Sequence, residues 1–139
     1  MVDTCVLIDV LENDASFGAA SAELLDSRRG EGLVVCPVTY VELAPGFLGN
    51  LRLQNDFLSN IGIDFSSAWT NSDTIAAHQA WNRHVVMKRK KTAAKRPLAD
   101  ILIGAFASNR TGLLTRNPND FTAAFPSLRI MLPAKWHSF

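Results

Sequence analysis

The sequence predicts an α/β domain with a central, mostly parallel sheet of four to five short strands flanked by helices. Leu33–Cys36 is a continuous apolar run, typical of a strand buried on both faces. Segments with helical spacing of apolar residues lie between this run and the other strand-like segments, and such alternation favours a parallel sheet. With 47% hydrophobic and 19% charged residues, residues 1–139 are expected to form one globular domain.

The first half of the chain predicts helices and strands in alternation. A first strand ending at Asp3 is expected to be short, because only Met1 and Val2 precede it. Val6, Leu7, Val10 and Leu11 then have helical spacing. The remaining predicted elements are helices over Ser16–Arg29, Val38–Leu48 (bent or broken at Pro45) and Asn50–Asn60, and strands over Leu33–Cys36 and Ile61–Phe65.

The second half is organised around a helix over Pro97–Asn109. Ile101–Ala107 has no polar side chain, which predicts a helix buried on every side. A long helix from Thr70 or Ser72 to about Lys91 precedes it. Strand Leu113–Thr115, a loop over Arg116–Phe121 and an edge strand over Arg129–Leu132 follow.

Composition excludes several classes of protein. No apolar run approaches the ~20 residues that a transmembrane helix needs, and no signal peptide is recognisable. Cys5 and Cys36 form no zinc motif, so we expect two free thiols in a reducing cytoplasm. Seven of the fourteen Lys and Arg residues lie between Arg83 and Arg96; this basic block is either solvated surface or a region that attracts phosphates.

Four acidic residues are candidates for one site. Asp3 follows the first strand and Asp120 follows Leu113–Thr115, and ligands of parallel α/β sheets bind at the carboxyl ends of strands. Asp100 begins the buried helix, where it either joins these acids or only complements the helix dipole. Helical spacing places Glu42 on an inward face, where it needs an arginine partner or a metal ion.

A divalent cation would account for converging carboxylates. Carboxylates in one cleft repel one another and raise each other's pKa, and a cation reverses this effect. Mg²⁺ and Mn²⁺ prefer such oxygen ligands, and a metal in this setting can activate a water against a phosphodiester. The sequence has no P-loop, dinucleotide-binding motif or convincing catalytic triad that would indicate another chemistry.

Four segments, in order, resemble the signatures of PIN domains, most closely those of VapC-type toxins: Val2–Asp9, Val38–Gly46, Asp100–Ala107 and Leu114–Phe121. The resemblance implies a PIN-like fold and a Mg²⁺- or Mn²⁺-dependent endoribonuclease that hydrolyses RNA with a metal-activated water. It implies that Asp3, Glu42 and Asp100 hold the metal. It also implies an RNA substrate, a homodimer and a cognate VapB-type antitoxin.

The remaining site residues follow from the same resemblance. Asp120 is the candidate fourth acid, and Asn117 is a candidate neutral ligand or water contact. Thr4 and Thr115 resemble hydroxyl residues that line the site, and Arg116 is either a phosphate contact or an exposed loop arginine. The sequence departs from the family at Cys5, where Asn or Ser is usual.

Two alternatives to a toxin remain open at this stage. The first is an RNA-processing PIN nuclease without an antitoxin. The second is a PIN-fold binding module that has lost nuclease activity. Cys5 and Asn117 are compatible with this alternative.

Overall fold

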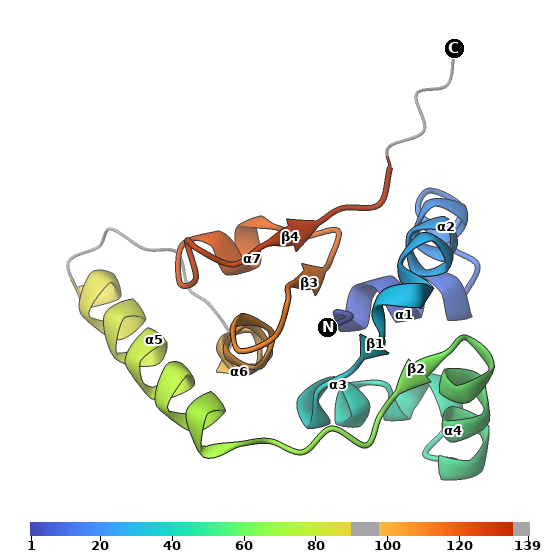
Figure 1. Ribbon diagram of the computed structural model, residues 1–139, viewed down its shortest axis with the longest axis horizontal. Helices are drawn as coiled ribbons and strands as arrows, with labels where there is room; N and C mark the ends of the chain where they lie inside the picture. The colour runs from blue at the N-terminus through green and yellow to red at the C-terminus, as the bar shows by residue number, and fades with distance from the viewer. Residues whose placement is uncertain (90–97, 135–139) are drawn as a thin grey trace.

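Strands and helices alternate along the chain, as the sequence predicts. The computed structural model describes residues 1–89 and 98–134 (Figure 1). Its α-helices are α1 (Thr4–Leu11), α2 (Gly18–Arg28), α3 (Pro37–Glu42), α4 (Leu51–Asn60), α5 (Asn71–Arg89), α6 (Leu98–Ser108) and α7 (Asn119–Thr122). Its strands are β1 (Leu33–Val34), β2 (Ile63–Asp64), β3 (Leu113–Leu114) and β4 (Ile130–Met131), and its 3₁₀ helices are η1 (Arg29–Glu31) and η2 (Ala44–Phe47).

The strands form two short parallel pairs, so the predicted single sheet of four to five strands is wrong. Strand β1 pairs with β2, with Leu33 opposite Ile63. Strand β3 pairs with β4, with Leu113 opposite Ile130. In two places a helix cuts the extended segment short: Asp3 caps α1 directly after Val2, and Pro37 begins α3 soon after β1.

The N-terminal residues lie between the two pairs. The Val2 amide donates to the Val34 carbonyl at 2.8 Å, on the side of β1. On the other side, the Asp3 amide donates to Leu114 O and the Leu114 amide donates to Met1 O, both at 2.9 Å. Val2 forms only an isolated parallel bridge with Leu114, yet this segment places the carboxyl ends of β1 and β3 on either side of Asp3.

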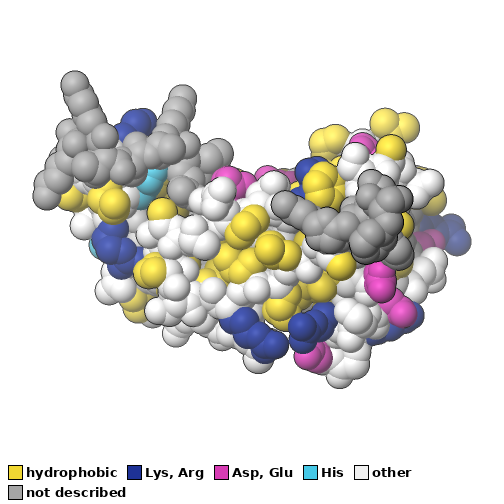
Figure 2. Space-filling model, turned by 90° about the horizontal axis from the view of Figure 1, so that it is seen from above, with side chains coloured by type: hydrophobic (Ala, Val, Ile, Leu, Met, Phe, Trp, Pro, Cys, Tyr) yellow, Lys and Arg dark blue, Asp and Glu magenta, His cyan; other side chains and the backbone are white. Residues whose placement is uncertain are grey.

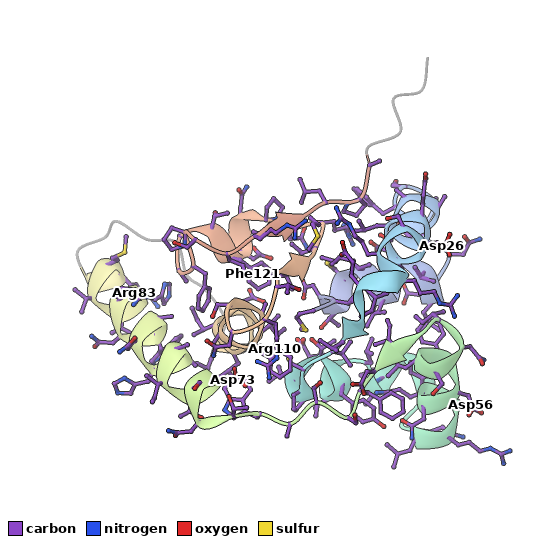
Figure 3. The ribbon with its side chains drawn as sticks, viewed as in Figure 1. Asp26, Asp56, Asp73, Arg83, Arg110 and Phe121 are labelled. Atoms are coloured by element: carbon purple, nitrogen blue, oxygen red, sulfur yellow. The ribbon has the colours of Figure 1, made fainter. Side chains whose placement is uncertain are left out.

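Helix α6 is the buried helix that its apolar sequence predicts. Ile101, Phe106 and Ala107 are fully buried. Helix α5 packs along α6, and α3 and α7 also contact it. Phe121 of α7, which is fully buried, extends toward this centre (Figure 3).

The helix predicted over Val38–Leu48 is divided. Helix α3 ends at Glu42 and η2 follows, with Pro45 in its first turn. Proline lacks the amide hydrogen that a continuing α-helix requires, which explains the break. Leu48 then adopts a left-handed conformation, with φ of 52°, before α4 begins.

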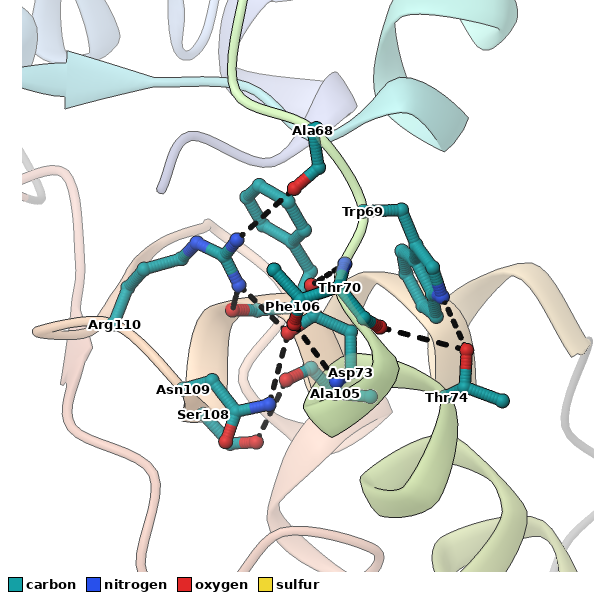
Figure 4. Close-up of polar contacts among 10 residues, drawn as sticks. All are labelled: Ala68, Trp69, Thr70, Asp73, Thr74, Ala105, Phe106, Ser108, Asn109 and Arg110. Carbon is teal, nitrogen blue, oxygen red and sulfur yellow. Dashed lines mark hydrogen bonds and ion pairs between the residues drawn. The ribbon is translucent and has the colours of Figure 1, made fainter.

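A buried network joins the start of α5 to the end of α6 (Figure 4). The Thr70 amide donates to Asp73 Oδ2 at 2.9 Å and the Asp73 amide donates to Thr70 Oγ1 at 3.2 Å, forming a capping box. Arg110 Nη1 and Asn109 Nδ2 both donate to Asp73 Oδ1, at 2.7 and 2.8 Å. The Arg110 guanidinium also lies 3.4 Å from the centre of the Phe106 ring.

These contacts control the ionisation of Asp73. Burial alone would raise the pKa of its carboxyl, but hydrogen bonds from Arg110, Asn109 and Thr70 outweigh burial and lower that pKa. Asp73 is therefore a buried carboxylate that the fold stabilises in its charged form. Its role is structural, because it anchors α5 on α6.

Two predictions from the sequence concern membrane-spanning helices and the basic block. Within residues 1–89 and 98–134, no helix combines the length and apolar character needed to cross a membrane. Most of the basic block lies at 90–97, outside the described residues. On the face seen in Figure 2, the described Lys and Arg side chains lie in separate groups around hydrophobic side chains.

Candidate functional site

Asp3 is the central acid of the candidate site. It lies between the two strand pairs, is 6% exposed and caps the N-terminus of α1. Its Oδ1 accepts a hydrogen bond from the Thr4 amide at 2.8 Å. This placement at the carboxyl ends of the parallel strands agrees with the position expected from the sequence.

Two side chains hold the other oxygen of Asp3. Thr115, fully buried directly after β3, donates from Oγ1 to Asp3 Oδ2 at 2.7 Å. The Cys5 thiol donates to the same oxygen at 3.3 Å. The residue that departs from the PIN pattern thus supplies a hydrogen bond, although a thiol is a weak donor.

Burial raises the pKa of the Asp3 carboxyl. The hydrogen bonds from Thr115, Cys5 and Thr4 act in the opposite direction, and the nearby charge of Asp120 raises the pKa further. Asp120 therefore lies within electrostatic range of Asp3, as the sequence predicts. The same surroundings raise the pKa of the Cys5 thiol to about 11, through burial and the Asp3 charge, so this thiol stays protonated.

Glu42 reaches the site from the end of α3, but the predicted inward orientation is wrong. Glu42 is exposed, and its neighbour Val41 is 69% exposed. The short α3 ends at Glu42, so the continuous helical face on which the prediction relied does not exist. Its Oε1 nevertheless accepts a hydrogen bond of 2.7 Å from Thr4 Oγ1, next to Asp3.

Asp100 begins α6, as predicted. It lies in the first turn of this helix and is half-buried. At helical spacing it shares a face with Ile103 and Gly104, which are both buried. The turns that follow it are buried on every side of the helix, so Asp100 lies where α6 enters the core.

The segment after β3 carries the remaining candidates. The predicted loop over Arg116–Phe121 contains the short helix α7, with Asp120 exposed in its first turn. The backbone amide of the exposed Asn117 donates a hydrogen bond to Thr115 Oγ1 at 3.1 Å. Thr115 thus connects Asp3 with the segment that carries Asp120.

Arg116 makes a contact that the sequence did not reveal. Its Nε lies 2.9 Å from Oδ2 of Asp9, which is 2% exposed in α1. Ser21 of α2 donates to the same Asp9 oxygen at 3.1 Å. The only sequence signal was a carboxylate between Ile8 and Val10 in an apolar segment. The Arg116 side chain is 31% exposed, so it is a partly buried loop arginine with an ion-pair partner.

The donor atoms of this site suit a hard divalent cation. Asp3 and Asp120 repel each other electrostatically, and a cation between carboxylates would reverse that effect. No group of three or more His, Cys, Asp or Glu residues in 1–89 and 98–134 is arranged to hold a metal ion. The fit therefore depends on the donor type and on the Asp3–Asp120 relationship.

Comparison with solved structures identifies a similar fold. A chain in the crystal structure of VapBC2 from Rickettsia felis bound to a DNA fragment from their promoter superposes with a TM-score of 0.69. The two chains are 14% identical, and the match covers 95% of this chain and 96% of that one. No protein-family model and no curated protein matches the sequence. The match shows that the two chains share a fold, which agrees with the PIN-like fold that the four sequence segments predict.

Proposed function

We propose that this chain, which has a PIN-like fold, is a metal-dependent endoribonuclease and the toxin component of a type II toxin–antitoxin pair. The observation that carries the proposal is the position of Asp3. It is a buried carboxylate at the carboxyl ends of the strands, held by Thr115 and Cys5 and within electrostatic range of Asp120. A buried acid without a structural cation beside it in the described residues is typical of a functional site.

The proposed ligands for Mg²⁺ or Mn²⁺ are Asp3, Glu42, Asp100 and Asp120; among the described residues their carboxylates are not grouped around a metal position, so they would have to close on the cation when it binds. When bound, the metal would supply charge stabilisation at the phosphodiester and activate a water. Thr115 orients the Asp3 carboxylate, and Thr4 orients that of Glu42. These hydrogen bonds matter because each fixes the orientation of its own carboxylate and so reduces the reorganisation that the reaction requires.

The fold match supports one of the proposed partners. The similar chain belongs to a structure of VapBC2, which supports an antitoxin of the VapB type as the partner of this chain. RNA is the proposed substrate, and a homodimer is the proposed assembly. An RNA-processing nuclease without an antitoxin would use the same carboxylates, so the presence of a short adjacent antitoxin reading frame separates these two functions.

The first test is cleavage of structured RNA by the purified chain with Mg²⁺, Mn²⁺ or EDTA. We expect cleavage by the wild type only when metal is present. Asp100→Asn should abolish it. Asp56→Asn is the matched control, because Asp56 is exposed on α4 (Figure 3), a helix that carries none of the proposed metal ligands, and its neutralisation should leave cleavage unchanged.

Binding of metal is measured separately. Mn²⁺ should raise the melting temperature of the wild type and of Asp56→Asn, because ligand binding stabilises the folded state. The rise should be smaller for Asp100→Asn. Metal-independent cleavage that persists in Asp100→Asn would contradict the proposed site. No cleavage and no thermal response to metal would indicate instead a PIN-fold binding module.

A further inference from the structure

Arg116 is held from two sides next to the candidate site. It directly follows Thr115, whose hydroxyl contacts Asp3. Its Nε lies 2.9 Å from Asp9 Oδ2, and its guanidinium carbon lies 4.6 Å from the centre of the Phe17 ring. An ion pair at one edge and an aromatic face restrict both the position and the plane of the guanidinium.

The Asp9 carboxylate is buried and already engaged in this contact. It is 2% exposed, and its Oδ2 also accepts the hydrogen bond from Ser21. The Arg116 Nε atom is buried and close to this oxygen, but its N–H is not directed at it, so the contact is an ion pair without a hydrogen bond. A buried carboxylate with one cationic partner holds that partner strongly, because separation would leave its charge uncompensated.

The outer part of the Arg116 guanidinium stays available. The side chain is 31% exposed, and among the described residues Nε is the buried nitrogen that lacks a hydrogen bond. The contacts with Asp9 and Phe17 engage Nε and one flat face of the guanidinium, so the edge that carries the two terminal nitrogens is the part left for another ligand. Terminal guanidinium nitrogens of this kind bind phosphate oxygens in pairs.

We propose that Asp9, with Phe17, is a positioning residue that fixes Arg116 to bind a phosphate of the RNA backbone beside the carboxylate site. This inference rests on the proposed function, because it takes RNA as the ligand. Asp9 itself touches no substrate. It lowers the cost of binding by immobilising the arginine before RNA arrives.

The opposite signs of two effects make this role testable. Removal of a negative charge near an RNA-binding surface strengthens phosphate binding by simple electrostatics. Loss of a positioning contact weakens it, because the arginine must then be ordered on binding. Asp9→Asn removes the charge and keeps the shape of the side chain, so the direction of the change identifies the role.

The experiment measures the affinity of the full chain for a fluorescein-labelled single-stranded RNA of mixed sequence, in EDTA to prevent cleavage. We expect Arg116→Ala to weaken binding about tenfold and to reduce the salt dependence by about one phosphate contact. Asp9→Asn should weaken binding about threefold to tenfold. The double variant should bind like Arg116→Ala, because Asp9 acts only through Arg116.

Asp26→Asn is the charge control. Asp26 is exposed on α2 (Figure 3), and its loss removes one negative charge without touching Arg116. We expect unchanged or slightly tighter binding for this variant. If Asp9→Asn fails to fold, Phe17→Leu decides the matter, because it removes the aromatic face and keeps the ion pair; it should weaken binding in the same direction.

Equal or tighter binding by a folded Asp9→Asn would overturn the inference while leaving the nuclease proposal intact. Additive effects in the double variant would also overturn it. If the wild type neither binds nor cleaves RNA, the proposed function fails and this inference fails with it.

Discussion

Thr115 donates a hydrogen bond of 2.7 Å to Asp3 across 112 residues of sequence. This contact connects the first residues of the chain with the segment that follows β3. The Thr115 hydroxyl also accepts a hydrogen bond from the Asn117 amide, so it links that loop amide to the buried Asp3 carboxylate. The surroundings of Asp3 are therefore assembled from two segments far apart in the sequence, around one hydroxyl group.

Removal of that hydroxyl should damage the site more than removal of the neighbouring thiol. Thr115→Val keeps the shape and leaves Asp3 Oδ2 and the Asn117 amide without this partner, so we expect a loss of about 1–3 kcal/mol in unfolding free energy and reduced cleavage. Cys5→Ala should cost less, because a thiol is a weak donor. Urea unfolding and RNA cleavage assays measure the stability and the activity of both variants. Thr115→Ser, which keeps the hydroxyl, is the control. A larger effect of Cys5→Ala would contradict this order.

Asp3→Asn should abolish cleavage and stabilise the chain in EDTA. Burial and the Asp120 charge disfavour the Asp3 carboxylate in the folded state. Asn removes that charge while keeping an oxygen for the Thr4 amide, and it is also a good helix cap. Thermal unfolding of both proteins without metal measures the change. A lower melting temperature for Asp3→Asn would show that the charge contributes to folding.

Asp73→Asn should destabilise the fold in a pH-dependent way. Breaking its ion pair with Arg110 should cost about 3 kcal/mol at pH 7, the low end for a buried pair because Arg110 is 23% exposed. The folded-state pKa of Asp73 is lowered from 3.8, so its contribution is complete above that value and is lost as the pH falls through the lowered pKa. Urea unfolding from pH 7 to about pH 3 tests this. A difference from wild type that stays constant with pH would exclude the carboxylate as its source.

Gly104→Ala should destabilise α6 even though alanine favours helices. A Cβ at Gly104 would overlap the ring of Phe125, which is buried at 8% exposure. Overpacking of this kind costs about 1–3 kcal/mol, which exceeds the gain of about 1 kcal/mol in helix propensity. Denaturant unfolding measures the net effect. Adding Phe125→Leu to Gly104→Ala should recover part of the loss, whereas stabilisation by Gly104→Ala alone would show that the ring moves away at little cost.

The elements were largely predictable because their signals are local. The apolar run after Asp100 predicted a buried helix, and Ile101 and Phe106 are fully buried. Pro45 predicted the break after α3. The sequence offered Thr70 or Ser72 as the cap of α5, and the Thr70–Asp73 capping box identifies Thr70. Strand lengths were less predictable, because they depend on where pairing partners lie.

By itself, the sequence determined the alternation of helices and strands, the buried α6 and a helix directly after Asp3, whereas the strand predicted before Asp3 is only the isolated bridge of Val2. Those features depend on periodicity and caps between near neighbours. Only the tertiary structure decided that Glu42 is exposed, that Asp73 pairs with Arg110 and that Asp9 holds Arg116. Periodicity shows which face of a helix turns inward, but packing between distant segments decides which side chain meets a buried charge there.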